Sequence, residues 1–234
     1  SKINKQSQSE EKIKVIATLF PQYDFAKQIG GDKVDVSLLL TPGTETHTYE
    51  PTPQDIINVN KADLYIYTGK YMEPWSDKIA NSITSNTQVL DASKNINLIN
   101  EEQFEKEHDT IDNNEEESDN SHHHEYDPHI WLNPQNAIGM VKNIEEELCN
   151  IDPQNKEYYQ KNAENYINQL KSLDTEIETT IKESPKNKIA FGGTFAYAYF
   201  IQRYNLQYVS AYDSCGENSE PSVTKVKEVI DYMK

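Results

Sequence analysis

The sequence predicts an α/β protein with mostly parallel sheets, arranged as two lobes that one long helix joins. Three observations lead to this prediction. Strand-like and helix-like segments alternate between residues 14 and 92, an unbroken helical pattern follows from Pro153 to about Ser184, and a second, shorter alternation ends the chain. Because strands that alternate with helices favour parallel pairing, each alternating region predicts a parallel sheet.

The first alternating region has four predicted strands and two helices with recognisable ends. Pro21 opens the first helix, since proline fits the first helical turn, and Gly30-Gly31 closes it. The second helix has Thr52 as its N-cap and Pro53 in its first turn. The predicted strands cover residues 14–20, 34–40, 63–68 and 88–92.

The long helix is predicted from a stripe of apolar residues spaced three and four apart. The stripe comprises Tyr159, Ala163, Tyr166, Ile167, Leu170, Leu173, Ile177 and Ile181. Pro153 begins the helix and Pro185 stops it. At 1.5 Å per residue it spans roughly 48 Å, more than a small domain needs, so we expect a rigid spine between two lobes. A shorter helix over residues 134–149 precedes it.

The last part of the chain predicts a small second lobe. Strands are expected over residues 188–193 and 207–212, and helices over 195–203 and 222–233. A lobe with only two strands is small, so this C-terminal lobe is interpreted as truncated.

The domain boundaries follow from these elements. The predicted parts are a flexible N-terminal tether over residues 1–12, an N-terminal lobe over 13–150, a linker helix over 151–185 and a partial C-terminal lobe over 186–234. Within the first lobe, residues 95–126 are acidic and lack an apolar period, which predicts a disordered loop.

Composition excludes some classes of partner. The net charge is −17, the pI is about 4.7 and the mean hydropathy is −0.83. No basic stripe is present to neutralise phosphates, so a nucleic-acid partner is not expected. The acidic surface either attracts cations or serves solubility alone.

No apolar run is long enough to span a bilayer. Cys149 and Cys215 lack metal-type spacing, and free thiols are preferred to a disulfide.

The distribution of the six histidines is the strongest functional signal. His47 and His129 each lie in a proline-bounded turn, and the other four, His108, His122, His123 and His124, lie in the acidic loop. In open α/β sheets ligands bind at the carboxyl ends of strands, where two such turns can converge. Neutral imidazole is the commonest protein ligand for zinc, so the sequence predicts a metal site. Glu45 is a further candidate ligand, and the loop histidines form a weak accessory collector.

Several short motifs are distinctive: Thr18-Leu19-Phe20-Pro21, Pro42-Gly43, residues 47–55, residues 127–134, Arg203-Tyr204-Asn205-Leu206 and Glu220-Pro221-Ser222. With these motifs the chain resembles a known family, the metal-binding receptors of bacterial ABC importers for zinc and manganese. The resemblance covers nearly everything from Lys14 to Lys234. It implies two α/β lobes joined by one helix, with the metal held between them.

The resemblance also implies ligands and partners. His47 and His129 match two metal ligands, whereas Thr194 stands where the family has its third, and a hydroxyl is a poor zinc ligand. Asp213 and Glu217 are candidates to compensate. The histidine-containing loop indicates the zinc-specific branch. The expected partner is a membrane permease, and the expected location is extracytoplasmic, as a monomer with a possible lipid anchor.

Three alternatives stay open. The same scaffold could carry Mn²⁺, although imidazole favours zinc. A metal-dependent hydrolase would need a general base aimed at a bound water, and no HExxH-like motif is present. A surface adhesin is compatible with the resemblance. We expect a non-catalytic receptor.

Overall fold

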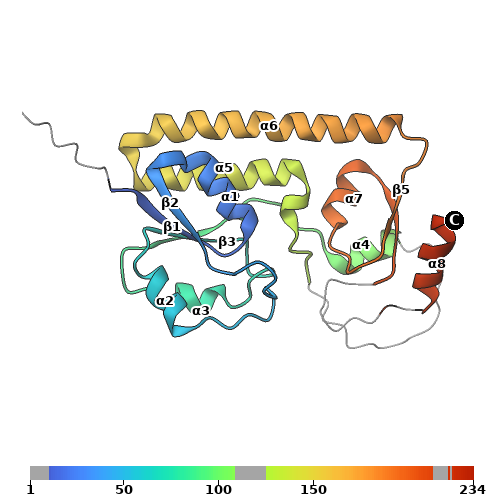
Figure 1. Ribbon diagram of the computed structural model, residues 1–234, viewed down its shortest axis with the longest axis horizontal. Coiled ribbons are helices and arrows are strands. Elements are labelled where there is room, and N and C mark those ends of the chain that lie inside the picture. The colour runs from blue at the N-terminus through green and yellow to red at the C-terminus, as the bar shows by residue number, and fades with distance from the viewer. Residues whose placement is uncertain (1–10, 109–124, 213–220, 222) are drawn as a thin grey trace, which may run out of the picture. The chain divides into compact units, whose positions relative to one another are not determined.

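The computed structural model describes residues 11–108, 125–212, 221 and 223–234 (Figure 1). The chain divides into two compact units. The first comprises Ser1–Lys94 with Met140–Ile167, and the second comprises Asn95–Gly139 with Asn168–Lys234. The predicted α/β class with parallel sheets and one long helix is confirmed.

The first unit is built on a four-stranded parallel sheet in the order β2-β1-β3-β4. The strands are β1 (Ile13–Ala17), β2 (Val34–Leu38), β3 (Leu64–Tyr67) and β4 (Gln88–Asp91). In the register of the central pairs, Val15 lies opposite Val36 on one side and opposite Leu64 on the other. The order reverses direction between β1 and β3, which makes their carboxyl ends the switch point of the sheet.

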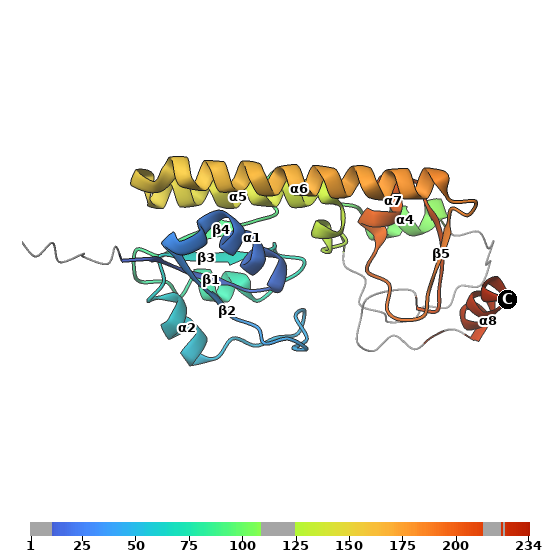
Figure 2. The ribbon, with the colours of Figure 1, turned by 45° about the horizontal axis from the view of Figure 1, so that its top comes forward.

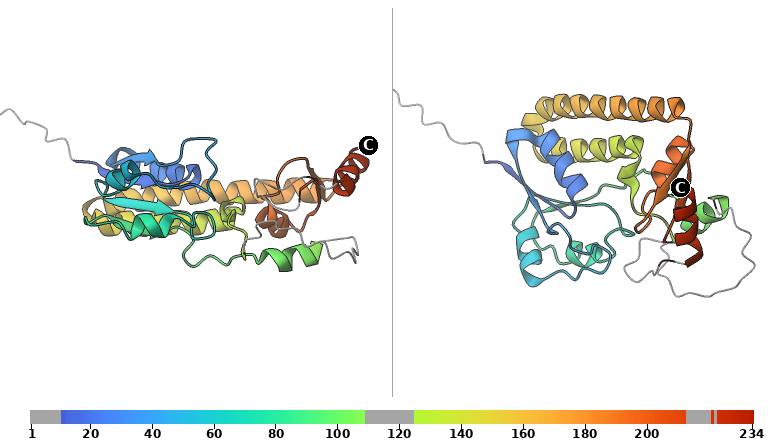
Figure 3. Two further views of the ribbon diagram at one scale, coloured as in Figure 1. Left: turned by 90° about the horizontal axis from the view of Figure 1, so that it is seen from below. Right: turned by 45° about the vertical axis from the view of Figure 1, so that its right-hand side comes forward.

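Helices cover both faces of this sheet. The helix α1 (Phe20–Gly30) lies on one face, together with the parts of α5 (Pro134–Ile151) and α6 (Lys156–Glu183) that belong to this unit (Figure 2). The short helices α2 (Pro53–Val59) and α3 (Ser76–Ala80) lie on the opposite face (Figure 3, right). On that face Leu40, Val59, Tyr65, Trp75 and Ile79 form a buried core. The 3₁₀ turns Gly31–Lys33 and Pro153–Asn155 complete the connections.

The second unit contains a two-stranded parallel sheet of β5 (Lys188–Phe191) and β6 (Gln207–Ser210). The helix α8 (Val223–Met233) contacts both strands, and α7 (Ala198–Tyr204) lies on the side of the sheet away from α8 (Figure 1). The unit also holds α4 (Glu101–His108) and the 3₁₀ turn Ile130–Leu132.

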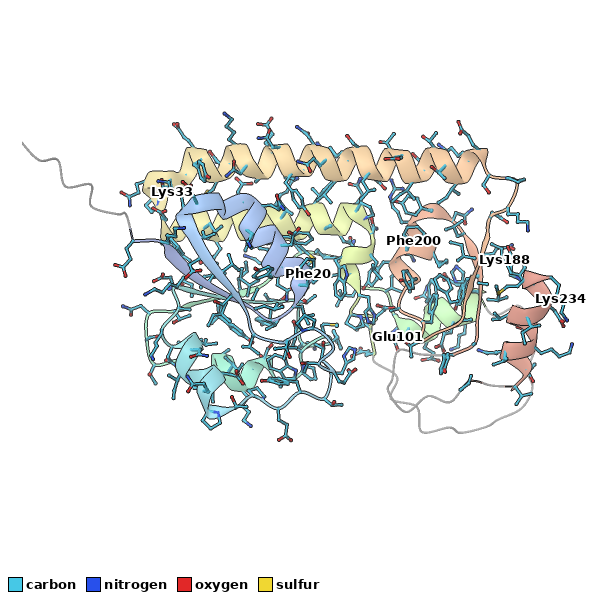
Figure 4. All side chains as sticks on the ribbon, viewed as in Figure 1. Phe20, Lys33, Glu101, Lys188, Phe200 and Lys234 are labelled. Carbon is cyan, nitrogen blue, oxygen red and sulfur yellow. The ribbon has the colours of Figure 1, made fainter. Side chains whose placement is uncertain are left out.

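The long helix α6 agrees closely with its prediction. It runs over Lys156–Glu183, after the 3₁₀ turn that Pro153 begins, and ends before Pro185. Its outward face carries a row of projecting side chains (Figure 4). Of the predicted apolar stripe, Tyr159 and Ala163 are fully buried, whereas Leu173 is 46% exposed. The apolar stripe is therefore best buried near the start of the helix.

The prediction of disorder over residues 95–126 is wrong for part of that segment. Residues 101–108 form α4, and Asn100 pairs with Tyr126 in an antiparallel bridge. The physical reason is tertiary packing: Phe104 is 4% exposed because its ring stacks against Phe195 and Tyr208. Residues 109–124 lie outside the described residues. The segment also groups with the second unit, not with the N-terminal lobe to which the predicted boundaries assign it.

Candidate metal-binding residues

His47 belongs to the first unit, in the connection between β2 and α2. Its side chain is half-buried, and its backbone N–H donates a hydrogen bond to Oε1 of Glu45 at 3.0 Å. That contact gives Glu45 a part in shaping the turn that carries His47. The candidate role of Glu45 as a ligand stays a prediction.

The chain after His47 is fixed by the start of α2. Thr52 and Asp55 form a capping box, in which each side chain accepts a hydrogen bond from the other residue's backbone N–H, at 2.7 and 3.2 Å. The hydroxyl of Tyr49 donates to the same Asp55 carboxylate at 2.7 Å. The predicted N-cap at Thr52 is thus confirmed, and it anchors the segment that follows the histidine.

This cluster shifts two pKa values. Burial and the hydrogen bond to Asp55 raise the pKa of Tyr49 to about 12. Burial opposes ionisation of Asp55, but hydrogen bonds from Thr52 and Tyr49 outweigh it and lower the pKa of its carboxyl. Asp55 is therefore an ionised acceptor at neutral pH, and the capping box is retained over the whole physiological range.

His129 belongs to the second unit and is only 8% exposed. Asp127 binds it twice through one oxygen: Oδ1 accepts from the backbone N–H of His129 at 2.8 Å and pairs with its ring Nδ1 at 2.9 Å. A carboxylate on Nδ1 fixes the ring orientation and the tautomer, so the nitrogen that would coordinate a metal is Nε2. The ring of Trp131 lies edge-on to His129, with the ring centroids 5.7 Å apart.

The turn that carries His129 is anchored on both sides. On the upstream side the hydroxyl of Tyr199 donates to the carbonyl of Asp127 at 2.7 Å and accepts from the N–H of Ile99 at 3.1 Å. The backbone N–H of Asp127 donates to the carbonyl of Ile99 at 2.9 Å. Because Tyr199 and Asp127 are both buried, these bonds hold the peptide before His129 in one position.

On the downstream side, a buried carboxylate ties the start of α5 to α6 and α7. Asp174 accepts from the amide of Gln135 at 2.6 Å, from two guanidinium nitrogens of Arg203 at 3.1 and 2.7 Å, and from the hydroxyl of Tyr204 at 2.8 Å. Burial opposes ionisation of Asp174, but these donors outweigh it and lower its pKa. A fixed ion pair thus supports the helix that begins next to the histidine turn.

The other predicted site residues do not form a described cluster. Thr194 is exposed in the connection between β5 and α7. His108 ends α4, where its Nδ1 lies 2.9 Å from the carbonyl of Phe104 and its ring stacks on Phe104 at 4.2 Å. The remaining candidates, His122, His123, His124, Asp213 and Glu217, lie outside the described residues. Within the described part of the chain, no group of three or more His, Cys, Asp or Glu side chains could hold a metal ion.

Sequence reasoning missed the supporting groups. In the sequence Asp127 belongs only to a motif, although a carboxylate two residues before a histidine is a signal that indicates its role. Asp174 and Tyr199 carry no local signal, because their partners are about thirty to a hundred positions away in the chain.

No helix among the described residues has the length and apolarity to cross a membrane.

The chain is an α/β protein with parallel sheets and one long helix, and each of its two units carries one of the histidine turns. Comparison with known proteins gives the family: residues 15–234 match the family ZnuA, described as the periplasmic component A of a zinc-uptake complex. The chain belongs to this family of zinc-uptake components. The family consists of transport receptors rather than enzymes, and it is extracytoplasmic, in agreement with both expectations.

Two curated relatives show how much of a longer protein the chain covers. It is 40% identical to the high-affinity zinc uptake system protein ZnuA of Bacillus subtilis, over 96% of this chain and 68% of that protein. It is 32% identical to the zinc-binding lipoprotein AdcA of Streptococcus pneumoniae, over 98% of this chain and 44% of that protein. The chain therefore spans about two thirds of the first relative and less than half of the second.

Solved structures agree with the family. The metal-dependent lipoprotein YcdH of Bacillus subtilis superposes with a TM-score of 0.73 at 35% identity, over 94% of this chain and 74% of that one. The Zn(II)-bound ZnuA-like domain of Streptococcus pneumoniae AdcA superposes with a TM-score of 0.75 at 28% identity, over 95% and 75%. These similarities support the α/β architecture.

Proposed function

We propose that the chain is a high-affinity zinc receptor that delivers Zn²⁺ to the permease of an ABC importer, and that His47 and His129 both ligate the ion. The observation that carries the proposal is the Asp127–His129 pair. A buried imidazole whose Nδ1 is held by a carboxylate is the arrangement that metal-ligating histidines usually have. Membership of a zinc-uptake family supports the choice of ion and the permease as partner.

Further ligands are needed, since two imidazoles leave a tetrahedral zinc incomplete. Glu45, Asp213 and Glu217 are the candidates in this proposal, with water at any position left open. His108 and the residues 122–124 are proposed as accessory binders of lower affinity. The family preference for zinc and the imidazole ligands both favour Zn²⁺ over Mn²⁺.

Thermal unfolding with and without zinc tests the ligands. Binding to the native state alone stabilises it by RT ln(1 + [L]/Kd), about 2.7 kcal/mol at a hundredfold excess over Kd. We expect the wild type to show this shift and the double variant His47→Ala, His129→Ala to lose most of it. Glu102→Ala is the control, because this exposed carboxylate pairs with Lys106 within its own helix and is not among the proposed ligands. Equal zinc-induced shifts in the wild type and the double variant would refute the ligand assignment.

A further inference from the structure

Trp75 contacts the His47 turn although it lies 29 positions beyond Thr46 in the sequence. Its indole Nε1 donates a hydrogen bond to the carbonyl of Thr46, the residue just before His47, at 2.7 Å. Both Trp75 and Thr46 are 8% exposed, so water does not compete for this bond. The peptide that leads into the histidine is therefore bound to a core aromatic residue.

The segment that carries Trp75 is itself fixed to the sheet. Glu73 is fully buried, and its carboxylate accepts hydrogen bonds from the backbone N–H groups of Thr68 and Gly69, directly after β3, and from the hydroxyl of Thr18, directly after β1. Gly69 has φ +142, and a Cβ there would lie 2.7 Å from the hydroxyl of Ser93, so only glycine fits. Trp75 thus extends from a rigid base.

A second aromatic contact completes the support. The ring of Tyr49 meets Trp75 edge-on, with centroids 5.1 Å apart and planes at 65°, and the hydroxyl of Tyr49 binds Asp55 in the capping box of α2. The turn is held on the upstream side of His47 by Trp75 and on the downstream side by Tyr49. The backbone at His47 therefore has contacts to the core on both sides.

We propose that Trp75 is a positioning residue for zinc binding: its indole N–H holds the Thr46 carbonyl and so presets the His47 imidazole for the ion. The inference rests on the proposed function, because it acts through His47 as a ligand. Without the bond, the Thr46–His47 peptide gains conformational freedom that zinc binding must remove again, which weakens affinity.

The test compares zinc affinity in variants that lose one buried hydrogen bond. Trp75→Phe removes the donor and keeps an aromatic ring. Tyr159→Phe is the matched control in the same unit, since it removes a buried hydroxyl bond to Asp152 that does not involve the His47 turn. A buried hydrogen bond corresponds to about a threefold to tenfold change in an equilibrium constant, so we expect Trp75→Phe to weaken zinc by that factor and Tyr159→Phe to leave it unchanged.

A double-mutant cycle separates positioning from general stability. In a His47→Ala background we expect Trp75→Phe to have no further effect on zinc affinity, while its effect on unfolding by urea persists. Replacing Trp75 by 3-benzothienylalanine, which lacks only the N–H, gives the same answer if the Phe variant does not fold. Unchanged zinc affinity in the Trp75 variants, with His47→Ala still impaired, would overturn the inference alone. Unchanged affinity in His47→Ala would overturn the ligand assignment on which it rests.

Discussion

Replacing Asp127 tests how far a single carboxylate controls the affinity for zinc. One oxygen, Oδ1, accepts both the backbone N–H and the ring Nδ1 of His129, at 2.8 and 2.9 Å. Asp127→Ala removes both bonds, so the ring loses its orientation and its fixed tautomer. Loss of such an outer carboxylate weakens metal binding by about 10- to 100-fold, or about 1.4 to 2.7 kcal/mol.

Asp127→Asn sharpens the same test. The amide oxygen can occupy the position of Oδ1 and keep both hydrogen bonds, while the negative charge that strengthens them is lost. We therefore expect a loss of affinity for Asn that is less than about tenfold, smaller than the loss for Ala.

A competition titration against a zinc chelator at neutral pH measures both variants. Glu102→Ala is the control, since this exposed carboxylate on α4 pairs with Lys106 within its own helix. Urea unfolding of the metal-free proteins shows whether the fold is retained. An Asp127→Ala variant that binds zinc within twofold of the wild type would refute the role assigned to this carboxylate.

Two further predictions concern stability. Asp174→Ala leaves Arg203 without its buried partner, so we expect the free energy of unfolding in urea to fall by about 3 to 5 kcal/mol. The control is Glu178→Ala, in the exposed Glu178–Lys182 pair on the same helix, for which we expect a fall of less than about 0.5 kcal/mol. Equal falls in the two variants would contradict the buried network. Burial raises the pKa of Glu73 from 4.5 to about 7, against the effect of its hydrogen bonds. Between pH 4.5 and 7 the native state therefore holds a proton that the unfolded state releases. The free energy of unfolding has its full contribution from Glu73 below pH 4.5, and it falls by about 3 kcal/mol as the pH rises to 7. Unfolding measured across this window should show the decline in the wild type and not in Glu73→Gln, and parallel profiles would show that Glu73 does not titrate there.

The fold could be predicted where local signals agree with tertiary packing. The strands of the first unit, the capping box at Thr52 and the helix between Pro153 and Pro185 all carry periodicity or end signals in the sequence. The helices α3 and α4 could not be predicted in this way. In α4 the only buried residue is Phe104, and its partners Phe195 and Tyr208 lie far along the chain.

In the candidate site too, some residues can be predicted from local sequence signals and others only from the packed structure. Residue type and turn context predict His47 and His129 as ligands, because imidazoles in two proline-bounded turns form a recognisable pattern. The groups that hold them follow from contacts over long separations, such as Trp75 to Thr46, and these depend on the packed core. Sequence reasoning therefore supplies the proposed ligands, and the structure adds the contacts that keep each imidazole in place.

The buried Glu73 has a consequence for which small molecules this sheet can accept. In open parallel sheets a phosphate or another anion commonly occupies the crevice where the strand order reverses, held by backbone amides. Here that position lies between β1 and β3, and the amides of Thr68 and Gly69 already bind the chain's own carboxylate. The carboxyl group of Glu73 thus occupies this position, and it closes the position to nucleotides and free phosphates, which bind there in related sheets. In this unit, ligand binding therefore depends on the loops, and the sheet supports those loops.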